Sequence, residues 1–245
     1  MPTCALSIWG SPLMADSAAI ELRSPRIFLD APSVRAALAA QTNAQPVLTF
    51  LVNLVRAGER TTPYSMITAA GAPLVPADMR DDEIILNQWL ADDLKAAPGA
   101  EISLAYFQPD SGARLVEATN RFRVRAVVPM QMPWADRTLM PDFPGIAKAE
   151  RAGDWDAGFP LVHKIRAKDE DYWKKYRGTP KAFISIRPHR CEAEPTPACA
   201  RLMRGALALT CATHSFRSRV GKPLRATTSM GPSVARPIGS KSLTG

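Results

Sequence analysis

Between residues 26 and 129 the chain alternates apolar runs with short polar or glycine- and proline-containing segments. The apolar runs have the length of strands, and in 101–107 and 121–129 apolar and polar positions alternate as in a half-buried strand. The expected strands are 26–29, 47–56, 65–69, 83–86, 101–107, 115–118, 121–129 and 181–186. The strands at 47–56 and 65–69 are close neighbours, which predicts an antiparallel hairpin with a longer loop.

Two segments have the residue pattern of helices. Residues 34–40 are rich in good helix formers, and Asn87 is expected to cap a second helix over 88–96, ended by Pro98-Gly99. Hairpins mixed with a few helices, without regular βαβ alternation, predict an α+β fold. We therefore expect a mixed, largely antiparallel sheet with a few short helices.

Residues 130–181 differ from the segments before them. They are rich in Pro, Asp, Trp and Tyr, and they predict a loop-rich insertion with one short helix around 145–152. The first 21 residues show no clear periodicity and are expected to form an irregular N-terminal extension. The folded domain is thus expected to span residues 22–186.

Charge divides the chain at about Arg187. The 245 residues are 46% hydrophobic and 22% charged, as in an ordinary globular protein, with a formal net charge of +8. Residues 187–245 hold ten basic and two acidic side chains, so they carry the whole net charge, and they contain three of the four cysteines. This composition, nearly without aromatic residues, predicts a disordered C-terminal tail. The abrupt shift in charge and cysteine content suggests the hypothesis that the tail is translated from GC-rich DNA read out of frame.

No apolar run reaches the roughly 18 residues that a membrane-spanning helix needs. The best run, 46–55, contains Thr49 and Asn53 and is expected to be a buried strand. The first 16 residues lack a basic start and a strong apolar stretch, so they predict neither a signal peptide nor an anchor.

Several side-chain groups are candidates for chemistry. Three acidic clusters could pair as general acid and base, but each lies at an expected turn or helix surface, which favours solvated faces. These clusters are Asp81-Asp82-Glu83, Asp92-Asp93 and Asp169-Glu170-Asp171. His163 has no nucleophile motif beside it, and the sequence has no phosphate-binding Gly-x-x-x-x-Gly-Lys loop.

Two groups in the tail are also weak candidates. A zinc set would consist of Cys191, Cys199, Cys211 and His214, but the spacing does not match the close pairs of structural zinc sites. The tail's basic residues could bind nucleic acid or anionic lipid, although aromatic residues are not interleaved with them. We expect no catalytic residue, no cofactor and no metal site.

Four aromatic residues, Trp155, Tyr172, Trp173 and Tyr176, group within the insertion beside basic residues. They could form a contact surface for a partner or a polysaccharide, because aromatic residues and arginine anchor interfaces. The alternative, which we favour, is that Trp155 and Trp173 fill a small satellite core under long loops. Either way, the insertion is the best place to look for specificity.

The segment 82–106, DEIILNQWLADDLKAAPGAEISLAY, resembles the extracytoplasmic core domain of ABC-transporter permeases of the MacB/FtsX type. Those domains carry a strand, an Asn-x-x-Leu-Ala-x-x-Leu helix and a glycine turn into a strand, followed by a strand similar to 121–129. Residues 137–186 and the tripeptide Pro63-Tyr64-Ser65 resemble features of one subgroup. The likeness covers roughly residues 22–186.

The resemblance implies a fragment of a permease subunit whose extracytoplasmic domain couples membrane motion to substrate or partner handling. Its partners would be membrane helices of the same chain, a second permease copy and a cytoplasmic ATPase subunit, and ATP hydrolysis would occur on that separate subunit. The resemblance places the domain at the cell membrane, on its extracytoplasmic side. Two alternatives stay open: a small soluble hydrolase using acids near Asp92 or within 150–172, and a nucleic-acid-binding protein acting through its tail.

Overall fold

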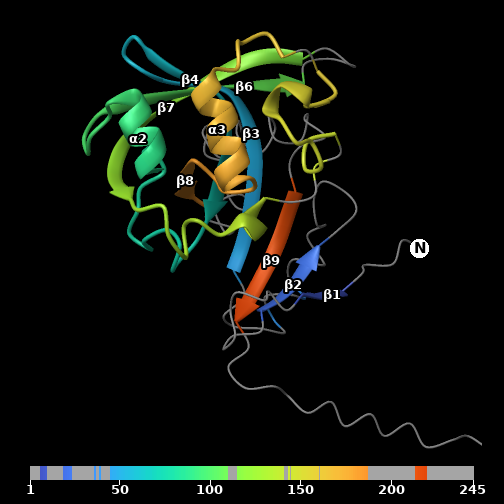
Figure 1. Ribbon diagram of the computed structural model, residues 1–245. Coiled ribbons are helices and arrows are strands. Elements are labelled where there is room, and N and C mark those ends of the chain that lie inside the picture. The colour runs from blue at the N-terminus through green and yellow to red at the C-terminus, as the bar shows by residue number, and fades with distance from the viewer. Residues whose placement is uncertain are drawn as a thin grey trace, which may run out of the picture.

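The computed structural model describes most of the chain between residues 45 and 186. The described residues are 6–9, 19–23, 36, 39, 45–109, 115–140, 143, 145–159, 161–186 and 213–219. The strands are β1 (Leu6–Trp9), β2 (Ala19–Arg23), β3 (Gln45–Ala57), β4 (Arg60–Ala70), β5 (Glu83–Asn87), β6 (Glu101–Pro109), β7 (Leu115–Val128), β8 (Ala182–Ser185) and β9 (Thr213–Arg219). The helices are α2 (Gln88–Leu94) and α3 (Ala167–Tyr176), with 3-10 turns η1 (Arg137–Leu139) and η2 (Ala152–Asp154) (Figure 1).

Six strands close into a barrel. They follow the order β3-β4-β8-β5-β7-β6, and β6 returns to pair with β3 at Leu54–Arg56. The pairs β4–β8 and β5–β7 are parallel, and the other pairs are antiparallel. β9, β2 and β1 extend the sheet from the other half of β3, where Gln45–Thr49 pairs with β9.

The predicted α+β fold is therefore wrong, because the described residues form a closed barrel with two α-helices rather than a sheet with helices. Periodicity shows which residues form strands, but it does not show which sheet edges meet. Here the same edge of the 13-residue strand β3 serves β9 at its start and β6 at its end. A strand long enough to be shared in this way brings the last edge of the sheet back to the first.

Several predicted elements differ in detail. The β3–β4 hairpin turns tightly at Gly58-Glu59 rather than through a longer loop, and the strands expected at 115–118 and 121–129 form one strand, β7. The described residues between 145 and 152 form turns instead of the predicted helix, whereas the helix α3 was not predicted. The strand expected at 26–29, and the helix at 34–40 apart from two positions, lie outside the described residues.

The tail was expected to be disordered, but residues 213–219 form β9, which pairs with β2 and β3. The other positions of 187–245 lie outside the described residues. Nothing in the described part of the chain is a helix long and apolar enough to cross a membrane.

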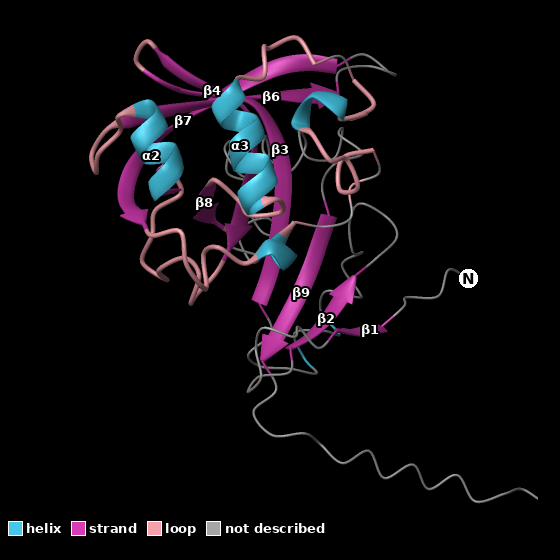
Figure 2. Ribbon diagram, viewed as in Figure 1, coloured by secondary structure: helices cyan, strands magenta, loops and turns pink. Residues whose placement is uncertain are grey.

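The apolar run of β3 reflects burial on both faces. Phe50 and Val52 lie in the main core with the inward residues of the other barrel strands, whereas Leu51 between them packs with Trp155 and Trp173. A strand covered on both sides has no polar face, which explains why its sequence does not alternate. Figure 2 shows α3 passing in front of β3 on this outer side.

Candidate functional site

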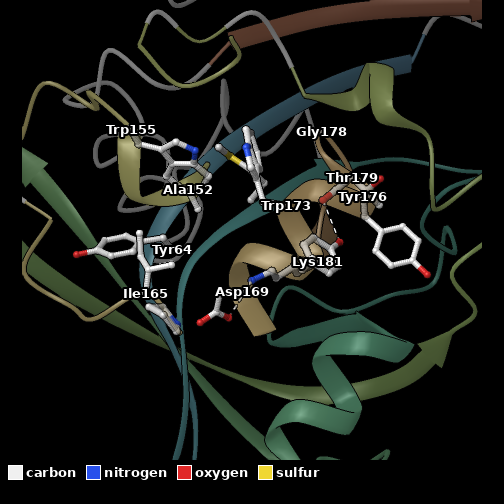
Figure 3. A pocket seen from close by; sticks show the side chains of 13 residues that line it. Tyr64, Ala152, Trp155, Ile165, Asp169, Trp173, Tyr176, Gly178, Thr179 and Lys181 are labelled. Atoms are coloured by element: carbon white, nitrogen blue, oxygen red, sulfur yellow. Dashed lines mark hydrogen bonds and ion pairs between the residues drawn. The ribbon is translucent and has the colours of Figure 1, made fainter. Parts of the chain in front are cut away.

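The insertion covers a small pocket on the outer face of β4 (Figure 3). The side chains that matter below are Tyr64, Trp155, Asp169, Tyr172, Thr179 and Lys181. The cavity volume is about 30 Å³. One water needs roughly 10–15 Å³, so a cavity of this size has room for about two waters and not for a sugar or a peptide.

Lys181 is the buried cation of this pocket, with 5% of its side chain exposed. Its Nζ lies 4.5 Å from the ring centre of Trp89 and 4.9 Å from that of Tyr172. The nearest carboxylate oxygen recorded for it, Asp169 Oδ1, is 3.9 Å away, which is longer than a hydrogen bond. Burial lowers the pKa of Lys181 to about 8, against the opposing attraction of Asp169.

Next to Lys181, one arginine joins two buried carboxylates. Arg166 Nε and Nη2 donate to the two oxygens of Asp169 at 2.6 and 2.7 Å, and Nη2 also donates to Asp93 at 2.7 Å. Its Nη1 donates to the carbonyl of Thr61 at 2.7 Å. Arg166 thus ties α3 to α2 and to the start of β4.

Asp93 remains ionised in this network. Burial alone would raise its pKa, but hydrogen bonds from Lys168, Thr62 and Arg166 outweigh burial and lower it. A general acid must hold a proton near neutral pH, and a carboxyl group with a lowered pKa does not. The carboxylate of Asp93 therefore serves as an ion-pair acceptor between α2 and α3.

Asn87 links α2 to the end of the insertion. Its Oδ1 accepts from the N–H of Leu90 at 2.8 Å, which confirms the predicted cap. Its Nδ2 donates to the hydroxyl of Tyr172 at 3.0 Å and to the carbonyl of Pro180 at 3.1 Å. The helix ends at Leu94, slightly before the predicted position.

Tyr64 anchors the other side of the pocket. It lies within β4 with a φ of 39°, in the left-handed region that non-glycine residues rarely adopt. Its hydroxyl accepts from the N–H of His163 at 2.7 Å, and the two rings lie 5.9 Å apart. Burial raises the pKa of Tyr64, so the hydroxyl stays protonated.

The four aromatic residues of the insertion lie at this pocket. Trp155, Tyr172 and Trp173 are buried, and only Tyr176 is partly exposed. Trp155 and Trp173 meet edge to face with ring centres 4.8 Å apart. Trp155 and Trp173 belong to a satellite core with Leu51 and Tyr64. The partner surface formed by the four aromatic residues stays a prediction.

The structure separates the predicted acidic clusters. Asp82 and Glu83 lie by Arg80, and Glu83 also pairs with Arg125, at 3.0 Å, far along the chain. Glu170 accepts the N–H groups of Ala152 and Gly153 and so holds η2. Only Asp93 and Asp169 come together, through Arg166.

Within the described part of the chain, no group of three or more His, Cys, Asp or Glu side chains is placed to hold a metal. The candidate set Cys191, Cys199, Cys211 and His214 offers no test, since its cysteines lie outside the described residues and His214 is described only as part of β9.

Sequence reasoning missed Lys181 and Arg166. Arg166 lies in a segment that was expected to be loop, and Lys181 is the first residue of the strand expected at 181–186; isolated charges at such positions usually face water. The signal that was available is Lys181 itself, a lysine directly before the apolar strand AFIS, where the chain enters the barrel.

No family model matches the sequence, and no curated protein matches it. Among solved structures, one similar chain is a domain of a protein assigned as a permease, from Porphyromonas gingivalis, with 9% identity and a TM-score of 0.33. The match covers 78% of this chain and 62% of that one. Similarity at this level carries no argument about fold or function.

Proposed function

We propose that this chain is a fragment of an ABC-transporter permease subunit, namely its extracytoplasmic domain of the MacB/FtsX type. The domain is a mechanical and binding element, and ATP hydrolysis belongs to a separate cytoplasmic subunit. The proposal rests on the sequence resemblance of residues 82–106 and 137–186. In the intact protein the domain lies outside the cytoplasmic membrane and works beside a second permease copy.

One structural observation supports the proposal. The two segments that carry the resemblance meet at Asn87, the first residue of the helix motif. This single side chain caps α2 and also bonds the hydroxyl of Tyr172 and the carbonyl of Pro180 in the insertion. The motif and the insertion therefore fold as one unit, as expected if both belong to the same domain.

The geometry also fits a mechanical role. Arg166 fixes α3 to α2 and β4, and the buried aromatic side chains fill the space between the insertion and the barrel. A domain that transmits motion needs such rigid connections between its parts. The pocket of about 30 Å³ is too small for most transported substrates, so substrate contact would use another surface.

The gene itself provides the first test. The locus should be resequenced and translated in three frames, from upstream of Met1 to well beyond Gly245. We expect one frame to yield a strand after Ile186 and apolar spans of about 20 residues near this domain. A locus that encodes no such span in any frame would overturn the permease assignment.

A second test concerns location. Alkaline phosphatase, which is active only outside the cytoplasm, can be fused within the full-length permease near residue 186. Activity is expected if the domain is extracytoplasmic, and a fluorescent protein that matures only in the cytoplasm is the matched control. Fluorescence without phosphatase activity would place the domain in the cytoplasm and contradict the proposed location.

A further inference from the structure

Lys181 stands where the insertion enters the barrel, and its backbone belongs to the barrel. Its N–H donates to the carbonyl of Met66 in β4 at 2.8 Å, and its carbonyl accepts from the N–H of Asn87 in β5 at 2.9 Å. β8 begins at the next residue. The main chain of Lys181 is therefore fixed to β4 and β5, independently of the contacts that its side chain makes with the helices.

The side chain of Lys181 is covered by the two helices. Its Nζ lies 4.5 Å from the ring centre of Trp89 in α2, 4.9 Å from that of Tyr172 in α3, and 3.9 Å from Oδ1 of Asp169 in α3. Figure 3 shows the side chain extending toward Asp169. Only 5% of it is exposed, so docking of α3 is what separates the ammonium from water.

The ammonium is attracted in this position but poorly solvated. Its distance from Asp169 exceeds a hydrogen bond, and both oxygens of that carboxylate already accept from Arg166. Among the residues that the structure describes, Nζ donates to no acceptor, and the adjoining cavity has room for only about two waters. Burying three N–H donors of a cation in this way is costly, whereas burying a neutral amine is much less so.

The other charged groups nearby do not remove this cost. The charged and titratable side chains that surround the ammonium, besides Asp169, come from α2, α3 and β4: Asp93, Arg166, Lys168, Tyr172, Tyr176 and Tyr64. Asp93 attracts the ammonium, but Arg166 and Lys168 repel it. Burial is the largest influence and lowers the pKa of Lys181 from 10.5 to about 8, against the attraction of Asp169.

We propose that the insertion carries a pH-sensitive latch, in which protonation of Lys181 weakens the docking of α3 on the barrel and loss of that proton strengthens it. When α3 lifts, the ammonium becomes hydrated, so the protonated form favours the lifted state. The neutral amine gains little from hydration and packs between the rings of Trp89 and Tyr172. Since α3 joins the insertion to the barrel, the pH sets how firmly the two move together.

The direction of the effect follows from proton linkage. A group whose pKa is lower in the docked state contributes stability that is complete above its pKa in the open state and is lost as the pH falls through its docked value. For Lys181 these values are 10.5 and about 8. The equilibrium constant for opening of α3 should therefore fall by about tenfold between pH 7 and pH 9. Burial raises the pKa of Tyr64 and Tyr172, so both hydroxyls stay protonated in this range.

Hydrogen exchange of the α3 amides tests the latch in the full chain. Dividing each exchange rate by the intrinsic rate at the same pH gives the equilibrium constant for opening. We expect this constant to fall about tenfold from pH 7 to pH 9 in the wild type. Lys181→Met keeps an apolar chain between the rings and should remove the pH dependence. Lys174→Met, which removes an exposed lysine of α3, is the matched control and should keep it.

An NMR titration of the wild-type chain gives a second test that does not depend on a variant folding. The ε-carbon resonance of Lys181 should titrate at a clearly lower pH than that of Lys174. The proposal is overturned if the two lysines titrate together, if opening of α3 does not decrease between pH 7 and pH 9, or if Lys181→Met keeps the wild-type pH dependence. The inference concerns only the folded domain, so its failure would leave the permease proposal standing, and the reverse also holds.

Discussion

Replacing Arg166 with methionine should destabilise the domain more than any surface change. The variant removes four side-chain hydrogen bonds of 2.6–2.7 Å and the cation between two carboxylates. The side chains of Asp93 and Asp169 are only 4% and 6% exposed. Removing one partner of a buried ion pair costs about 3–5 kcal/mol. Since Asp93 keeps Lys168 and Thr62, we expect the lower end, about 3 kcal/mol.

Urea unfolding at pH 7 measures this loss, with Arg121→Met as a control, because Arg121 forms only an exposed pair with Glu101. Adding Asp169→Asn to Arg166→Met should recover part of the loss, since the amide leaves no uncompensated charge. Because folding lowers the pKa of Asp93, its ionised carboxylate stabilises the folded state at pH values above the pKa of this group in the unfolded chain. This stabilisation is lost as the pH falls through the lowered pKa of the folded state. The difference between wild type and variant should therefore narrow in acid. A loss below about 1 kcal/mol, with an unchanged urea slope, would refute the reasoning.

Three further predictions concern the anchors of the insertion. Tyr64→Phe should cost about 1 kcal/mol and speed hydrogen exchange at the N–H of His163; unchanged exchange would contradict that bond. Asn87→Ser keeps a side-chain cap for α2 and loses the hydrogen bonds to the insertion, whereas Asn87→Ala loses both. The free energy of unfolding measured in urea should therefore be about 1 kcal/mol lower for Asn87→Ala than for Asn87→Ser. Gly178 has a φ of 81°, and a Cβ there would lie 2.7 Å from the carbonyl oxygen of Arg137. Gly178→Ala should therefore lower the midpoint of thermal unfolding by several degrees. An unchanged midpoint would contradict this prediction and show that η1 can shift to make room.

Local signals in the sequence were enough for several elements. Asn87 followed by an amphipathic segment predicted α2, because a cap and its helix are adjacent in the chain. The apolar run of β3 likewise predicted a buried strand, because the pattern that indicates the strand lies within the strand itself. In both cases the residues that decide the structure lie within a few positions of one another.

Closure of the barrel and assembly of the pocket could not be predicted in this way. Closure depends on β3 meeting β6, and the pocket depends on Arg166 reaching Asp93, 73 positions earlier. Helix α3 was missed because its residues are mostly charged, so its apolar face is reduced to Tyr172 and Trp173. Its stability comes from contacts with the barrel, which no local pattern records.

The place of β8 in the sheet has a consequence for synthesis of the chain. β8 lies between β4 and β5, and Ile67 pairs with Ala182, 115 positions further along. The ring of strands cannot close until the ribosome has released residue 185, so both neighbouring edges wait unpaired in the nascent chain. Pairings of such long range fold slowly, and exposed edges invite association with other chains. Until its last barrel strand has been synthesised, the nascent chain is therefore open to association with other chains through these two edges.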